Sequence, residues 1–205
     1  QSIFQSQFEN EILAEGNDAA RLSSHGNLKG ELALSTDSHV VSPLFFRGGD
    51  IGRLAVAGTV NDIAMLGARP YYLTAGFIIE EGFPMKDLKR IVNSMAEACH
   101  EAGVQIVAGD TKVVERGKVD GLFINTTGIG VIPQGIKIGG QNAKPGDAVL
   151  ISGSLGEHSI AVLEARGELG FESGIESDLA PLNHLVSSLL NEVPDIHVLR
   201  DPTRG

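Results

Sequence analysis

The amino-acid sequence predicts an α/β (α+β) fold in which helices flank a substantial mixed sheet. Short runs rich in branched and aromatic residues, at 71–80 and 122–132, are typical of β-strands. Between such runs, residues 51–66 and 84–102 carry apolar side chains at helical spacing. The resulting order of strand, helix, strand, helix, strand, strand predicts one sheet with helices packed against it.

The first elements follow from local patterns. Apolar residues at helical spacing predict an amphipathic helix over residues 1–20. Alternating residues predict a strand over 30–37, before the polar Thr36-Asp37-Ser38. Residues 51–66 are apolar on most faces, so we expect a helix that is buried on several sides and ends at Gly67.

The next elements have equally clear boundaries. Residues 71–80 are expected to form a strand, and Pro84 occupies the first turn of the following helix. The apolar stripe of that helix stops at Gly103. A short apolar run at 104–108 predicts a strand that ends in a glycine turn, and 122–132 predicts a longer one.

A cluster of turn residues between 133 and 146 predicts a domain boundary, which gives domains at 1–135 and 136–205. In the second domain we expect a buried strand at 148–151 and helices at 158–169 and 181–190. The glycine-rich 152–156 could hold an anion at a helix N-terminus or form a plain turn. This second domain is short for an independent core, so we expect it to be truncated.

Composition excludes several classes of function. A net charge of −10 and a pI near 5.0 argue against a surface that neutralises nucleic-acid phosphates. No apolar run reaches the roughly 18 residues that a membrane span needs. Cys99 is the one cysteine in the sequence, so no internal disulfide can form, and we expect a bacterial-type cytoplasm. Cys99 lies on an apolar stripe and is expected to be buried and inert.

Three aspartates are candidates for a metal site. Asp37 is expected at the end of a strand, Asp110 after a strand and a glycine, and Asp62 inside an otherwise apolar helix. A carboxylate in such a place needs a partner, because burying it alone costs several kcal/mol. Hard oxygen ligands from separate elements suit Mg²⁺. Each aspartate taken singly is better interpreted as a turn or cap residue; it is the coincidence of all three that favours the metal site.

Neighbouring residues suggest a phosphate-binding role. Asn61 forms a polar pair with Asp62. Gly109, Thr111 and Lys112 surround Asp110 and would offer close backbone approach, a hydroxyl and an ammonium group. The spacing is not that of a Walker A loop, so on its own it indicates nothing specific.

Taken together, the motifs resemble those of the hydrogenase maturation factor HypE family, from Ala20 to Gly205. They include Ser35-Thr36-Asp37-Ser38, Pro43-Leu44-Phe45-Phe46, Gly58-Thr59-Val60-Asn61-Asp62 and Gly109-Asp110-Thr111-Lys112-Val113-Val114. The Asn-Asp and Gly-Asp-Thr motifs are similar to those of the wider superfamily of aminoimidazole ribonucleotide synthetase, selenophosphate synthetase and thiamine-monophosphate kinase.

The resemblance implies a first domain that dimerises through its sheet and binds ATP, with Mg²⁺ held by Asp37, Asp62 and Asp110. It implies nucleotide contacts from Asn61, Gly109, Thr111 and Lys112, and a catalytic role for Asp62. The implied reaction is the ATP-dependent dehydration of a carbamoyl group on the protein's own C-terminal cysteine, which this sequence does not contain. Implied partners are the carbamoyltransferase HypF and the HypC–HypD scaffold complex.

Two alternatives remain at this point. One is a small-molecule kinase or synthetase of the same superfamily, such as a thiamine-monophosphate kinase. The other is a non-catalytic assembly module that uses its sheet to dimerise and to dock other maturation proteins.

Overall fold

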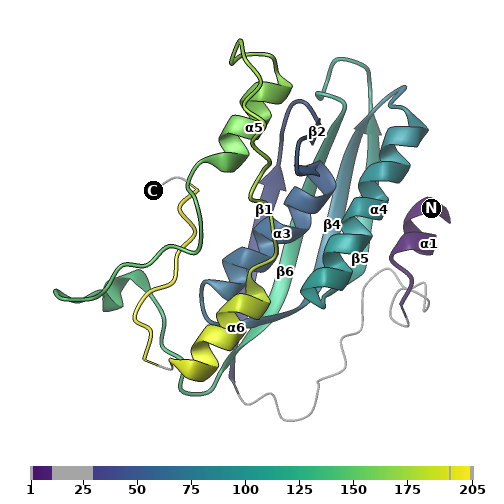
Figure 1. Cartoon of the computed structure of the whole chain (residues 1–205). Coiled ribbons are helices and arrows are strands. Elements are labelled where there is room, and N and C mark those ends of the chain that lie inside the picture. Colours follow the sequence, from purple (N-terminus) through teal and green to yellow (C-terminus); the bar gives the residue numbers. More distant parts are fainter. Residues whose placement is uncertain (1, 11–29, 194, 204–205) are drawn as a thin grey trace.

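A four-stranded mixed sheet forms the centre of the computed structural model, which describes residues 2–10, 30–193 and 195–203 (Figure 1). Its strands are β1 (Gly30–His39), β4 (Arg69–Glu80), β5 (Gln105–Val114) and β6 (Leu122–Pro133), in the order β1-β6-β4-β5. β6 pairs antiparallel with both β1 and β4, whereas β4 and β5 are parallel. The predicted fold class is confirmed.

Two helices cover one face of this sheet, which we call the covered face (Figure 1). They are α3 (Ile51–Ala64) and α4 (Met85–Ala102), close to the predicted ranges. α3 lies very near β6, because a Cβ atom on Gly128 would stand only 2.6 Å from Cδ1 of Ile63. Glycine at that strand position therefore lets the helix approach the sheet.

α4 is amphipathic and ends as predicted, because Gly103 takes the left-handed conformation, with φ of 69°. α1 (Ser2–Gln7) packs against α4. The rings of Phe4 and Phe77 lie 4.7 Å apart. The helix predicted over 1–20 ends at Gln7 within the described residues, and residues 1 and 11–20 of that prediction lie outside them. In the part of the chain that the structure describes, no helix is both long and apolar enough to cross a bilayer.

The opposite side of the sheet, which we call the uncovered face, is apolar and exposed. Leu32 and Leu34 of β1 are 71% and 69% exposed, while Ala33 between them is buried. Ile78 of β4 is 42% exposed as well. Because side chains alternate along a strand, these residues mark the face that the helices leave open.

β5 is longer than the predicted strand at 104–108 and includes Gly109 to Lys112, where the sequence predicts a turn. A Cβ atom on Gly109 would lie 2.5 Å from the carbonyl oxygen of Ala75 on β4. This glycine is therefore required by the close approach of the neighbouring strand, and it does not end β5.

The remaining elements are small. They are a hairpin of β2 (Phe45–Phe46) and β3 (Gly49–Asp50), the 3-10 turn η1 (Gly140–Asn142), α5 (Glu157–Ala165) and α6 (Asn183–Glu192). The buried strand predicted at 148–151 is wrong, because the structure assigns no strand there and Val149 and Leu150 are 90% and 87% exposed. A strand needs a neighbour to satisfy its backbone groups, and no described strand pairs with this run.

Candidate active site

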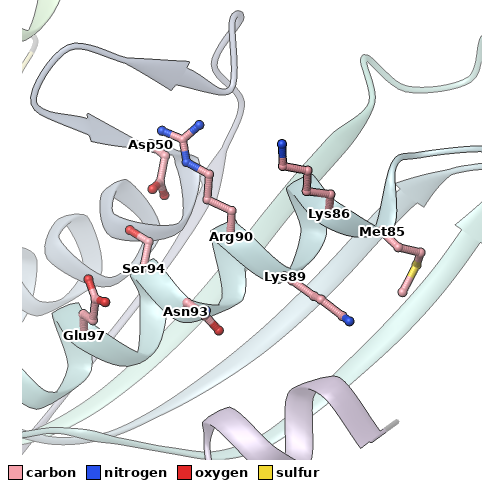
Figure 2. Close-up of a pocket in the computed structure, with 8 residues that line it drawn as sticks. All are labelled: Asp50, Met85, Lys86, Lys89, Arg90, Asn93, Ser94 and Glu97. Atoms are coloured by element: carbon pink, nitrogen blue, oxygen red, sulfur yellow. The ribbon is translucent and has the colours of Figure 1, made fainter.

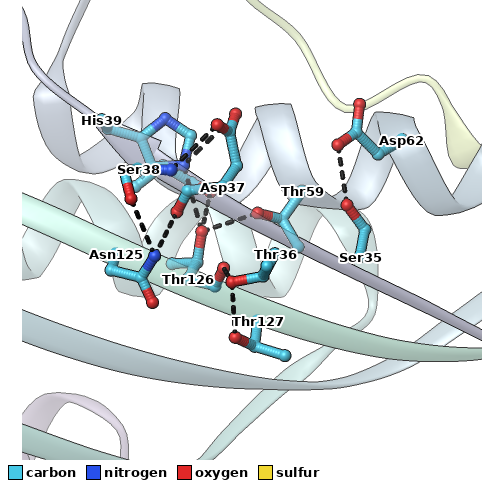
Figure 3. Close-up of polar contacts among 11 residues, drawn as sticks. Ser35, Thr36, Asp37, Ser38, His39, Thr59, Asp62, Asn125, Thr126 and Thr127 are labelled. Carbon is cyan, nitrogen blue, oxygen red and sulfur yellow. Dashed lines mark hydrogen bonds and ion pairs between the residues drawn. The ribbon is translucent and has the colours of Figure 1, made fainter.

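Asp37 and Asp62 lie near each other between the sheet and α3 (Figure 3). The hydroxyl of Ser35 donates a hydrogen bond of 2.7 Å to Oδ2 of Asp62. Asp37 stands two residues after Ser35 on β1, so both side chains point to the covered face. Both aspartates lie within elements, Asp37 inside β1 and Asp62 inside α3.

A third carboxyl group, from Asp201, completes this cluster, and sequence reasoning did not single it out. Burial is the main cause that raises the pKa of Asp62, and the hydrogen bond from Ser35 opposes it. The nearby Asp201 and Asp37 raise this pKa further, and Asp201 also shares a hydrogen bond with Asp62. Two carboxyl groups in contact need a shared proton or a cation between them.

Asp110 lies on the other side of the sheet. It pairs with Gly76, which pairs with Asn125, and Asn125 pairs with Ser38, one residue beyond Asp37. Residues in register share a face, so Asp110 is on the uncovered face, and Lys112 two residues later is too. The structure therefore brings Asp37 and Asp62 together but not Asp110.

The other two predicted site residues on β5, Gly109 and Thr111, alternate along the strand with Asp110 and Lys112. Gly109 pairs with Ala75 and Thr111 with Phe77, two residues whose side chains are buried on the covered face. Their predicted nucleotide contacts stay a prediction. Both positions are exposed at the edge of the sheet.

The amide group of Asn61 binds the backbone of the chain itself. Its Nδ2 donates to the carbonyl oxygen of Ala180 at 3.0 Å, and its Oδ1 accepts from the amide of Leu182 at 2.7 Å. Asn61 therefore attaches α3 to the segment that leads into α6.

Behind Asp37 lies a buried polar network (Figure 3). The Thr126 hydroxyl donates to the carbonyl oxygen of Ala55, so it must accept from Thr59 at 2.6 Å and from Nε2 of His39 at 3.1 Å. Nε2 of His39 is also 3.8 Å from Oδ2 of Asp37. Burial lowers the pKa of His39, against the opposing effect of Asp37, which favours a neutral ring in this position.

A separate groove of about 720 Å³ runs along the outer side of α4 (Figure 2). It is lined by Asp50, Met85, Lys86, Lys89, Arg90, Asn93, Ser94 and Glu97. None of these is a predicted site residue. The carboxylate of Asp50 is already engaged, because it caps α3 by accepting from the amides of Gly52 and Arg53 at 2.7 and 3.1 Å.

The cluster of Asp37, Asp62 and Asp201 has the chemistry of a divalent cation site. These oxygen ligands come from β1, α3 and the C-terminal segment, and Mg²⁺ commonly takes one or two carboxylates together with water and phosphate oxygens. Within the described residues, no three His, Cys, Asp or Glu side chains form a ready metal cage.

The comparisons with known proteins identify the family. Residues 16–132 match the family described as AIR synthase related protein, N-terminal domain. The chain belongs to this family.

Among its relatives, the chain is 58% identical over all 205 residues to the carbamoyl dehydratase HypE of Cupriavidus necator. It is 51% identical to the HypE of Escherichia coli strain K12 over 207 aligned positions. It covers 58% and 61% of these two proteins. The chain thus spans about three fifths of the length of the curated relatives it matches.

The chain also resembles solved HypE structures. A HypE crystallised in complex with ATP is 58% identical and superposes with a TM-score of 0.92 over 98% of this chain and 59% of that chain. A HypE–HypF complex gives 59% identity and a TM-score of 0.82, over 100% of this chain and 65% of that one. The thiamine-monophosphate kinase of Stenotrophomonas maltophilia, 23% identical over 92% of this chain and 58% of that one with a TM-score of 0.64, shares the fold.

We predict that Asp62→Asn increases the free energy of unfolding at neutral pH in the absence of divalent cations and nucleotide. The pKa of Asp62 is raised in the folded state, so wild-type stability falls as pH rises from the unfolded-state value of about 3.9 through the folded value. Urea unfolding from pH 3 to 8 measures this. The two proteins should converge at the acidic end.

Asp147→Asn is the control, and it should change the free energy of unfolding in the opposite direction. The hydrogen bond from His197 lowers the pKa of Asp147, so its charged form stabilises the fold and this variant should lose stability above that pKa. If Asp62→Asn also lost stability at neutral pH, the strained carboxylate cluster would be refuted.

Proposed function

We propose that the chain is the nucleotide-binding part of a HypE-type carbamoyl dehydratase. The observation that carries the proposal is the 58% identity along the whole chain to a carbamoyl dehydratase HypE, together with the carboxylate cluster at Asp62. The solved HypE that resembles the chain at a TM-score of 0.92 was crystallised with ATP. This supports ATP as the nucleotide, and we propose Mg²⁺ as its companion cation from the carboxylate cluster.

In this reaction a thiocarboxamide loses its oxygen and two protons and becomes a thiocyanate, while ATP and the removed oxygen give ADP and phosphate. Mg-ATP would supply the phosphoryl group that turns a poor leaving oxygen into a good one. The chain's own part is to hold and orient. Asp62 and Asp201 would bind the cation, with Asp37 adjacent, which is the basis for the catalytic role proposed for Asp62.

The carrier of the carbamoyl group must be a reactive thiol. Cys99 is the one cysteine among the 205 residues, and it is buried in the core. Burial raises the pKa of Cys99 to about 12, so almost none of it is thiolate at neutral pH. Cys99 therefore does not serve as the carrier, which fits the C-terminal cysteine that the family resemblance implies.

The test uses the full-length protein after carbamoylation of its C-terminal cysteine by the carbamoyltransferase HypF, the proposed partner. Adding Mg-ATP should remove the mass of one water from the protein and release one ADP per thiocyanate formed, as measured by mass spectrometry and nucleotide analysis. Asp62→Asn should lower the rate by about hundredfold or more, since it removes a cation ligand.

Asp120→Asn, on an exposed loop, is the control and should react like wild type. Phosphorylation of a soluble acceptor with no change in protein mass would instead support the kinase alternative. ATP consumption with no need of the carbamoyl group would contradict the dehydratase.

We also propose that the uncovered face is the homodimer interface, in a protein that works in the cytoplasm with HypF and the HypC–HypD scaffold. Support comes from the exposed apolar residues on that face, Leu32, Leu34 and Ile78, because large exposed apolar patches mark interaction sites. A dimer formed there would place Asp110 and Lys112 at the interface, which is where they could act on nucleotide phosphates.

The dimer prediction is that Leu34→Lys lowers the sedimenting mass to that of a monomer, since a lysine at the interface would be buried without a partner. Leu155→Lys is the matched control, because Leu155 is similarly exposed but lies far from the sheet in sequence and outside every strand. A wild-type monomer at tens of micromolar, or an unchanged Leu34→Lys dimer, would exclude this interface.

A further inference from the structure

Asn61 joins two parts of the chain that are distant in sequence. Both polar atoms of its side chain bind backbone of the segment 180–182, at 3.0 Å to the Ala180 carbonyl oxygen and 2.7 Å from the Leu182 amide. A primary amide presents a donor and an acceptor side by side, so it matches the alternating carbonyl and amide groups of an extended backbone. Aspartate would lack the donor, and an apolar residue would lack both groups.

The next residue on α3 engages the same C-terminal region at a second point. Asp62 shares a hydrogen bond with Asp201, which lies beyond α6, whereas Asn61 binds the segment just before α6. α6 itself packs against α3. Two adjacent polar residues therefore contact the chain on both sides of one helix.

We infer that Asn61 is a positioning residue that fixes the segment 180–182 on α3 and thereby keeps Asp201 beside Asp62, so that it acts on nucleotide through the backbone and makes no direct contact with it. This inference rests on the proposed function, because the Asp62–Asp201 pair matters for nucleotide only if it holds the cation. This role explains why the polar pair Asn61-Asp62 interrupts an apolar helix. Asn61 binds the segment 180–182, and Asp62 binds the cation together with Asp201, which that segment helps to position.

The first experiment tests the hydrogen bond between Asn61 and the Leu182 amide, by hydrogen exchange of that amide in the full-length protein. Asn61→Ala removes the acceptor of this amide and should speed its exchange by about tenfold, since one partly buried hydrogen bond is lost. Asn61→Asp keeps that acceptor and is the gentler variant, so its Leu182 amide should stay protected. Unchanged exchange in Asn61→Ala would overturn the inference.

The second arm is a double-mutant cycle on Mg-ATP affinity, measured by calorimetry. Asn61→Ala and Asp201→Asn should each weaken binding, by about tenfold, and the double variant should be no weaker than the weaker single variant, because both changes remove the same carboxylate. Losses that multiply to about a hundredfold would show that Asn61 contacts the nucleotide directly, and would overturn the inference.

Asn183→Ala is the matched control. It removes another asparagine tie of α6, from Nδ2 to the carbonyl oxygen of Ala102 at 2.8 Å, without touching Asn61. It should leave the Leu182 amide protected and Mg-ATP affinity unchanged; a tenfold loss of affinity in this variant would show that general loosening of α6 causes the effect. If wild type bound no Mg-ATP, the proposed function would fail and with it the role through Asp201, while the exchange arm would still decide whether Asn61 fixes the segment.

Discussion

The structure depends on a sheet that is covered on one side only. α3 can lie close to β6 because Gly128 and Gly130 leave room where any side chain would collide with Ile63. The alternation of side chains then sorts the polar residues of each strand between two environments. Asp37 faces the helix and lies near Asp62, while Asp110 is exposed on the opposite face of the sheet.

This arrangement concentrates unfavourable charge at one place. Burial and two neighbouring carboxyl groups raise the pKa of Asp62, so its charged form lowers the stability of the fold. Behind Asp37, Thr126 joins His39, Thr59 and the Ala55 carbonyl oxygen in a satisfied hydrogen-bond network.

Local sequence patterns predicted the sheet and its two covering helices because periodicity and glycine caps act within a few residues, as Gly103 shows. They failed where the cause was non-local. Gly109 looked like the end of a strand, but it is dictated by the carbonyl of Ala75 on the neighbouring strand. The apolar run at Val149 resembled a strand although no strand lies beside it. Asp201 gave no signal, because an aspartate before proline usually marks a turn and only the fold places it at Asp62.

The central claim is that carboxylates from the helix and from the C-terminal segment hold the nucleotide's cation. The most direct measurement is a crystal structure of the full-length protein with Mn²⁺ and a non-hydrolysable ATP analogue, in which anomalous scattering locates the metal. The account predicts a peak about 2.1 Å from carboxylate oxygens of both Asp62 and Asp201. A peak bound by neither of them, or held by Asp110 alone, would contradict it.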